Sequence, residues 1–201
     1  MGDPLLALMP KAKRRWTKSD PIMRKLVQDA APKERVYEYD EPFHALVQSI
    51  CHQQVSIHAG RAIGARVDAT SGKTPDGVLR AGPEKLRAAG LSRPKVAYVL
   101  DLAQKTRDKE VDFTRVGQMG DEEIIEMLTG VKGIGVWTAK MFLIFHMARP
   151  DVSAHEDLGI VLAVEQAYHV PRKRAGKKVQ AMRDAWAPYN SLAMLTLWNS
   201  R

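Results

Sequence analysis

The sequence contains almost no cysteine, since Cys51 is the only one in 201 residues. A single cysteine excludes a disulfide framework, a four-cysteine zinc site and an iron–sulfur cluster held by this chain alone. The sequence also lacks any apolar run near the roughly 20 residues of a transmembrane helix, and it shows no signal-peptide pattern. We therefore expect no membrane association and a location in the reducing cytoplasm.

Aromatic residues and metal-binding patterns are scarce as well. Aromatic side chains make up 6% of the sequence, although four of them are tryptophans, and the six histidines form no pair at metal-ligand spacing. A zinc enzyme is therefore not expected. Apolar residues at 45% and charged residues at 27% are typical of a globular protein. The length fits one large domain or two small lobes that share a core.

Basic residues exceed acidic ones, 31 to 23, which gives a formal net charge of +8. The excess is uneven, because residues 101–126 are acidic overall. Two basic clusters stand out, formed by Lys11, Lys13, Arg14, Arg15 and Lys18 and by Arg172, Lys173, Arg174, Lys177 and Lys178. A basic chain with one acidic region favours a polyanionic partner that is met from one side, such as a nucleic acid.

Helix start and stop signals recur along the whole chain, and no alternating strand pattern of useful length is present. The predicted helices begin near Pro21, Pro42, Ser56, Thr74, Pro83, Ser92 and Asp121, and four more cover 136–147, 157–168, 177–186 and 189–199. The connections between them are short and rich in glycine and proline. The sequence therefore predicts an all-α fold of about ten helices.

A glycine-rich segment, Leu-Thr-Gly-Val-Lys-Gly-Ile-Gly-Val-Trp-Thr-Ala at 128–139, separates two of these helices. Gly133 and Gly135 allow a tight turn and a close approach of another backbone. Ile134 between them is suited to anchor the turn in the core. Unpaired N–H groups at the start of the following helix form a ready phosphate site.

An acidic residue, Asp157, follows 20 residues after Trp137, in the segment Ser-Ala-His-Glu-Asp-Leu-Gly at 153–159. Taken alone, Asp157 at a helix start predicts an N-cap. A helix, this hairpin, a second helix, a loop and then an aspartate at a helix start together resemble the helix-hairpin-helix DNA glycosylase superfamily. Within it, the chain is most similar to the 3-methyladenine DNA glycosylase II group. The resemblance covers about residues 42–160 and extends more loosely to Trp198.

The resemblance implies two helical lobes with an active-site cleft between them. One lobe would span 42–149 and carry the helix-hairpin-helix motif at about 121–147, and the other would combine 1–41 with 150–201. It also implies the form without the N-terminal β domain of the longer relatives.

The resemblance assigns catalysis to Asp157, whose carboxylate would stabilise positive charge on the sugar while the base leaves. His155 and Glu156 lie next to it and are not assigned a catalytic role. Related enzymes that also cut the strand have a nucleophilic lysine at the position of Trp137. Lys132 and Lys140 are close in sequence but are not at that position, so we expect base removal without strand cleavage.

The resemblance also assigns the remaining site residues. The base pocket would be lined by Trp137, Trp198 and Met141. The residue pushed into the DNA in place of the extruded base would be Gln54, with Gln53 beside it. The DNA backbone would be met by Lys132, Gly133, Gly135 and Thr138. The main-chain carbonyls of Thr129, Val131 and Ile134 would hold a structural Na⁺ or K⁺, and no cofactor is needed for chemistry.

These features predict a monomeric DNA repair glycosylase of the cytoplasm, associated with the nucleoid in a bacterium. Its partner would be double-stranded DNA that contains an alkylated base of the 3-methyladenine and 7-methylguanine class. Two alternatives stay open at this point. One is a non-catalytic helix-hairpin-helix DNA-binding protein, which would not need Asp157. The other is a glycosylase for mismatched or oxidised bases, against which the missing lysine and the missing four-cysteine cluster argue.

Overall fold

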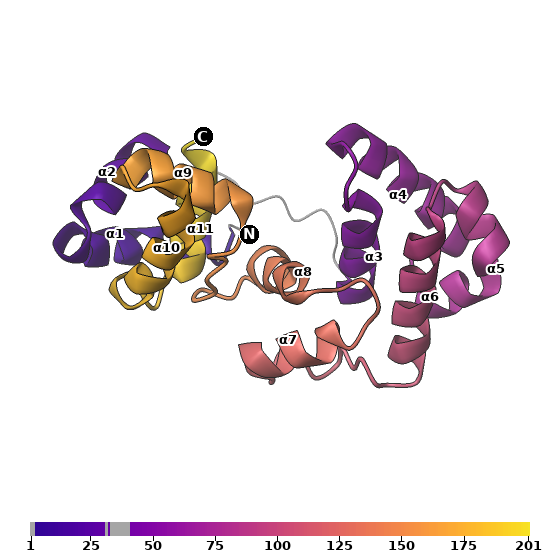
Figure 1. The fold of residues 1–201 in the computed structure, drawn as a ribbon. Coiled ribbons are helices and arrows are strands. Elements are labelled where there is room, and N and C mark those ends of the chain that lie inside the picture. Colours follow the sequence, from indigo (N-terminus) through magenta and orange to yellow (C-terminus); the bar gives the residue numbers. More distant parts are fainter. Residues whose placement is uncertain (1–2, 31, 33–40) are drawn as a thin grey trace. The chain divides into compact units, whose positions relative to one another are not determined.

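The computed structural model describes residues 3–30, 32 and 41–201 (Figure 1). Within these residues there are eleven α-helices, a short 3₁₀-helix at Leu6–Leu8 and a π-helical turn at Phe142–His146, and there is no strand. The prediction of an all-α fold is thereby confirmed. No helix in the described ranges is long and apolar enough to cross a membrane.

The chain forms two compact units. The central unit comprises Tyr37–Phe142, and the discontinuous unit combines Met1–Val36 with Leu143–Arg201. The sequence predicts boundaries at 42 and 149, and in the structure the helix that follows the hairpin changes to a π-helical turn at Phe142, where the central unit ends. The cleft expected between the lobes stays a prediction.

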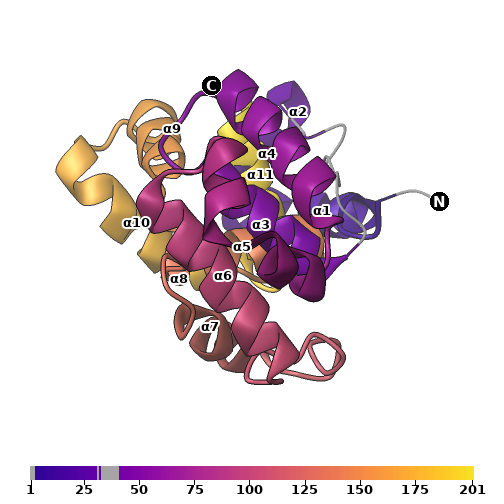
Figure 2. The same ribbon diagram turned by 90° about the vertical axis from the view of Figure 1, so that its right-hand side faces the viewer.

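The central unit contains helices α3 to α8, which follow one another along the chain (Figure 1 and Figure 2). Their bounds are α3 Pro42–His52, α4 Ile57–Ser71, α5 Pro75–Ala88, α6 Arg93–Arg107, α7 Asp121–Thr129 and α8 Val136–Met141. Helices α3 to α6 pack on one another, and α7 packs on α8. Apolar side chains such as Ile50, Val67, Leu86 and Leu102 are fully buried in this unit.

Most helix starts in the central unit agree with the sequence-based prediction. The hydroxyl of Ser56 accepts a hydrogen bond from the N–H of Ala59, and Thr74 and Ser92 cap α5 and α6 in the same way. The two helices predicted from Thr74 and Pro83 run into one another as α5, with a kink at Gly82, where φ is 70° and ψ is 176°. Glycine tolerates this backbone conformation, and the kink therefore falls between the two predicted segments.

The discontinuous unit contains α1 Met9–Ser19, α2 Pro21–Ala30, α9 Leu158–Tyr168, α10 Arg172–Trp186 and α11 Asn190–Asn199. Its helix α11 is almost entirely buried, as expected for a core helix. The sequence missed α1 and placed the start of α10 five residues too late. Neither helix has a side-chain cap, and dense basic residues mask the apolar spacing of Met9, Ala12 and Trp16 on α1.

A buried carboxylate ties the two halves of the discontinuous unit together. Asp20, only 3% exposed, accepts hydrogen bonds from the N–H groups of Ile22 and Met23 at the start of α2. Its other oxygen accepts from the Tyr168 hydroxyl at 2.5 Å and from the Trp186 indole N–H at 2.8 Å. Burial and the Asp20 carboxylate raise the pKa of Tyr168, so its hydroxyl keeps its proton and remains a donor.

Candidate functional site

Large hydrophobic side chains that are exposed mark the candidate site. Among the described residues they are Ile22, Val55, Ile57, Val136, Trp137 and Leu158. All but Ile22 adjoin segments that the sequence assigns to function: the turn after α3, the start of α8 and the start of α9. Exposed apolar side chains beside such segments favour a binding surface in the unit that carries them.

Asp157 is the N-cap of α9, as the sequence predicts. Its Oδ1 accepts a hydrogen bond from the N–H of Ile160 at 2.9 Å and from the indole N–H of Trp198 at 2.7 Å. Both donors hold the carboxylate in one orientation, at the positive end of the helix dipole.

Trp198 does more than the sequence suggests, because its indole N–H fixes Asp157. Its ring also stacks on Phe145, with centroids 5.6 Å apart and planes inclined by 30°. Gly159 leaves the room for this arrangement, since a Cβ there would lie 3.0 Å from both Asp157 Oδ1 and Trp198 Cδ1. Sequence reasoning missed Phe145 and Gly159, and the spacing of Gly159, two residues after Asp157, was the available signal.

His155 and Glu156 contact each other, with His155 Nδ1 3.3 Å from Glu156 Oε2. Both side chains are partly exposed. That neither residue acts in catalysis stays a prediction.

The hairpin between α7 and α8 is anchored by apolar side chains. Val131 and Ile134 are 2% and 4% exposed, and the N–H of Ile134 donates to the carbonyl of Val131 at 3.1 Å. Residues 129–135 line a surface hollow of about 510 Å³. The N–H groups of Gly133, Gly135 and Val136 have no acceptor among the residues that the structure describes. Such a group of unpaired amides can bind an anion.

One face of α6 holds the hairpin in place. The Asp101 carboxylate accepts from the N–H of Lys132 at 2.9 Å, and the Lys105 ammonium donates to the carbonyl of Gly130. Gly133 has φ +77°, and a Cβ there would lie 2.1 Å from the ring of Tyr98. Tyr98 thus fills the side of Gly133 on which a Cβ would stand. The spacing of Tyr98, Asp101 and Lys105 places them on one helical face, a pattern that sequence reasoning missed.

The other predicted hairpin residues differ in their surroundings. Gly135, the N-cap of α8, has open space where a Cβ would stand, and the side chain of Lys132 is 71% exposed. Thr138 is only 6% exposed and packs inside the unit, and its contact with the DNA backbone stays a prediction. Trp137 is 44% exposed, and Met141 lies one turn further along α8 on the same face.

The turn after α3 places the two predicted wedge residues differently. Gln54 is exposed and adopts a left-handed backbone, with φ +56°. The Nε2 of Gln53 donates to the carbonyl of Gly133 at 2.9 Å. Gln53 therefore binds the hairpin, and the wedge role of Gln54 with Gln53 beside it stays a prediction.

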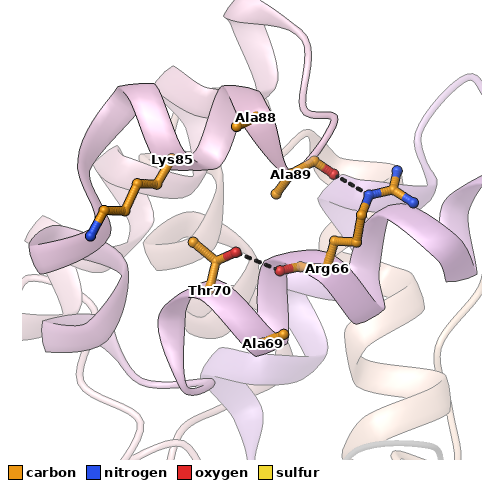
Figure 3. Close-up of a pocket in the computed structure, with 6 residues that line it drawn as sticks. All are labelled: Arg66, Ala69, Thr70, Lys85, Ala88 and Ala89. Atoms are coloured by element: carbon orange, nitrogen blue, oxygen red, sulfur yellow. Dashed lines mark hydrogen bonds between the residues drawn. The ribbon is translucent and has the colours of Figure 1, made fainter.

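A second surface hollow, of about 550 Å³, lies between α4 and α5 and contains none of the predicted site residues (Figure 3). Within it, the Arg66 guanidinium donates to the carbonyl of Ala89 at 2.8 Å, and Thr70 donates to the carbonyl of Arg66 at 2.7 Å. The ammonium of Lys85 points away from these groups (Figure 3). Arg66 thus caps the last turn of α5. Its polar groups are used in contacts within the fold, so we assign this hollow no functional role.

Two solved structures resemble the chain over almost its whole length. The DNA-3-methyladenine glycosidase from Bacillus halodurans is 33% identical, with a TM-score of 0.82 that covers 94% of this chain and 88% of that one. The 3-methyladenine DNA glycosylase Mag1 of Schizosaccharomyces pombe, solved in complex with abasic DNA, is 29% identical with a TM-score of 0.81 and covers 94% and 95%.

Proteins that are similar in sequence carry the same kind of name as these two structures. DNA-3-methyladenine glycosylase 1 of Schizosaccharomyces pombe is 30% identical over 181 residues, or 88% of this chain and 79% of that protein. The putative DNA-3-methyladenine glycosylase YfjP of Bacillus subtilis is 27% identical over 79% of this chain, which spans only 58% of that relative. Residues 47–188 match the family model described as HhH-GPD superfamily base excision DNA repair protein. Since this match covers most of the chain, the chain belongs to the HhH-GPD superfamily.

Proposed function

We propose that this chain is a DNA glycosylase that hydrolyses the N-glycosidic bond of alkylated bases, of the 3-methyladenine and 7-methylguanine class, in double-stranded DNA. The observation that carries the proposal is the carboxylate of Asp157, held by the Trp198 indole N–H at the start of a helix in an HhH-GPD chain. A protein that only binds DNA has no use for this fixed anion. The names of the relatives favour alkylated bases over mismatched or oxidised ones.

The chemistry follows from where charge develops. As the glycosidic bond breaks, positive charge builds on the sugar, and a carboxylate fixed in advance stabilises it without rearranging during the reaction. The same carboxylate can orient the attacking water. Methylation at N3 or N7 gives a purine a positive charge, so the base leaves readily and no strong general acid is needed.

Recognition of the base is assigned to aromatic side chains. A cationic base is attracted to an indole face by about 0.5–2 kcal/mol or more. Trp137, exposed at the start of α8, is suited to this contact, with the adaptable thioether of Met141 beside it. An enzyme that acts on a base in duplex DNA must first extrude it, and we assign the filling of the gap to Gln54.

The hairpin is assigned to the DNA backbone and to a monovalent cation. The carbonyls of Thr129, Val131 and Ile134 fit Na⁺ or K⁺, because they are neutral oxygens on residues that line one hollow. The described residues include no group of three or more His, Cys, Asp or Glu that would suit a divalent metal. When bound, the ion adds positive charge beside a phosphate.

The function is tested by the product. Duplex oligonucleotides that each carry one alkylated base should release that base and keep an intact abasic strand, and borohydride should trap no protein–DNA adduct. The reason is that Trp137 supplies no amine at the position of a strand-cutting lysine. Failure to release any alkylated base would contradict the proposal, and a trapped adduct would show that a lysine such as Lys132 or Lys140 acts as nucleophile. The same preparation, sized in solution, tests the expected monomer.

Gly135→Ala tests the phosphate site. A Cβ at Gly135 meets nothing within 4 Å in this chain, and its φ of −94° suits alanine, so the fold should be unchanged. The methyl group would stand beside the unpaired amides, and we expect affinity for undamaged and damaged duplex to fall by the same factor, about tenfold, measured by fluorescence anisotropy.

Lys132→Glu, which inverts an exposed charge, should lower both affinities and make binding less dependent on salt. Gly133→Val is not a matched probe, because its Cβ would strike Tyr98 and disturb the hairpin itself. A loss confined to damaged DNA in Gly135→Ala would place Gly135 in the base pocket and contradict the assignment.

Trp198→Phe tests the hold on Asp157. Phenylalanine can keep the stack on Phe145 but cannot donate a hydrogen bond to the carboxylate. A hydrogen bond to a charged group contributes about 1.5–3 kcal/mol, so single-turnover base release should slow by about 10- to 100-fold. Affinity for undamaged duplex should stay the same. An unchanged rate of release would show that the N-cap bond from Ile160 alone is enough to orient Asp157.

A further inference from the structure

The turn between α3 and α4 is fixed at both of its ends. We call Gln53–Ser56 the wedge loop. Before it, the imidazole of His52 lies against Gly60 of α4, where a Cβ would come within 2.3 Å of its Cδ2, and His52 Nδ1 is 2.8 Å from the carbonyl of Gln48. After it, the Ser56 hydroxyl caps α4. Both ends of the wedge loop are thus held by α3 and α4.

Polar contacts lock those two helices to each other. The Gln48 amide donates to Asp68 Oδ1 at 2.8 Å and to the carbonyl of Gly64 at 3.3 Å, and His44 Nε2 is 3.0 Å from both carboxylate oxygens of Asp68. A Cβ at Gly64 would lie 2.0 Å from Gln48 Oε1. Directional bonds of this kind fix how α3 lies on α4, and so fix the position of the loop between them.

The wedge residue itself has a strained backbone. Gln54 is an exposed residue other than glycine with φ +56°. For such residues a left-handed conformation is strained, and it persists where the surroundings determine it. Val55 and Ile57, next to it, are 41% and 66% exposed. The loop therefore presents Gln54 beside exposed apolar side chains. Gln54 has a backbone conformation that is unfavourable for a residue other than glycine.

Gln53 links this loop to the hairpin. Its Nε2 donates to the carbonyl of Gly133, and the backbone there is already fixed by Tyr98 at Gly133 and by Asp101 at Lys132. Gln53 is part-exposed and stands 80 residues away from Gly133 in sequence. The bond thus joins two separately fixed elements, of which one carries the unpaired amides and the other carries Gln54.

We propose that Gln53 is a positioning residue that couples the wedge loop to the hairpin, so that Gln54 enters the base stack at a fixed distance from the gripped phosphate. This rests on the proposed function. Extruding a base costs a few kcal/mol, and a plug offsets this cost only if it reaches the gap while the backbone is held. A loop fixed in advance loses little conformational entropy when it binds.

The test uses Gln53→Met, which is similar in length and cannot donate, beside Gln118→Met, an exposed glutamine of the same unit, as the matched control. The probes are a duplex with a tetrahydrofuran abasic analogue next to 2-aminopurine, and the undamaged duplex of the same sequence. Affinity is measured by anisotropy, and entry of the wedge by the rise in 2-aminopurine fluorescence at saturation.

We expect Gln53→Met to bind undamaged duplex within twofold of the wild type, because the hairpin amides are intact. Its affinity for the abasic duplex should fall about tenfold, and its fluorescence rise should shrink toward that of Gln54→Ala. The double variant Gln53→Met/Gln54→Ala should be no worse than Gln54→Ala alone, since Gln53 acts through Gln54. Gln118→Met should match the wild type.

Three results would overturn the coupling. They are an unchanged fluorescence rise in Gln53→Met, an equal loss of affinity for both duplexes, and a double variant whose losses add. None of these readouts needs base release. A chain that releases no alkylated base therefore contradicts the proposed function, while the fluorescence comparison still decides the role of Gln53.

Discussion

Asp157→Asn is expected to slow base release by about 10²–10³-fold, the usual cost of removing one well-placed charge stabiliser. Affinity for DNA should stay equal or rise, because a negative charge near phosphates is removed. The measurement is single-turnover release from an oligonucleotide with one alkylated base, together with anisotropy on the same duplex.

This substitution removes the charge of Asp157 without removing its hydrogen bonds. The asparagine Oδ1 can still accept from the N–H of Ile160 and from Trp198, so the N-cap and its geometry are kept and only the charge is lost. Asp112→Asn, at a partly exposed carboxylate of the central unit, changes the net charge by the same amount and should release bases like the wild type. Normal release by Asp157→Asn would remove Asp157 from the chemistry.

Trp137→Ala is expected to reduce release of a cationic lesion by about 10- to 100-fold, and release of a neutral lesion of similar shape by less. Both bases lose stacking on the indole, but only the cationic base also loses the cation–π attraction. The variant should not gain strand cleavage, because alanine supplies no amine. Single-turnover release of one cationic and one neutral lesion, by wild type and variant, measures the difference.

Val136→Ala is the matched control, since Val136 is the neighbouring residue and is similarly exposed, 48% against 44%. It should leave the ratio between the two lesions unchanged. Equal slowing of both lesions by Trp137→Ala would limit Trp137 to stacking, and recognition of charge would have to come from other groups.

Features set by short stretches of sequence could be predicted. The helix starts at Ser56, Thr74 and Ser92 could be predicted because each cap needs only an N–H three residues away. The burial of Ile134 and the N-cap position of Asp157 follow from equally local patterns.

Contacts between distant segments could not be predicted in this way. The bond from Trp198 to Asp157 spans 41 residues, and the bond from Gln53 to Gly133 spans 80. Both depend on how helices pack, which no local spacing encodes. This is why the sequence assigned Trp198 only to a pocket wall and Gln53 to the wedge. The burial of Thr138 was missed for the same reason.

The division of the chain also sets an order in time. The central unit is one continuous stretch, whereas the discontinuous unit takes residues from both sides of it. A ribosome adds roughly 5–20 residues per second, and domains generally fold as units as they emerge. The bonds of Asp20 must wait for Tyr168 and Trp186, and the bond that orients Asp157 must wait for Trp198. During synthesis, the hairpin is therefore complete before the carboxylate is set in place.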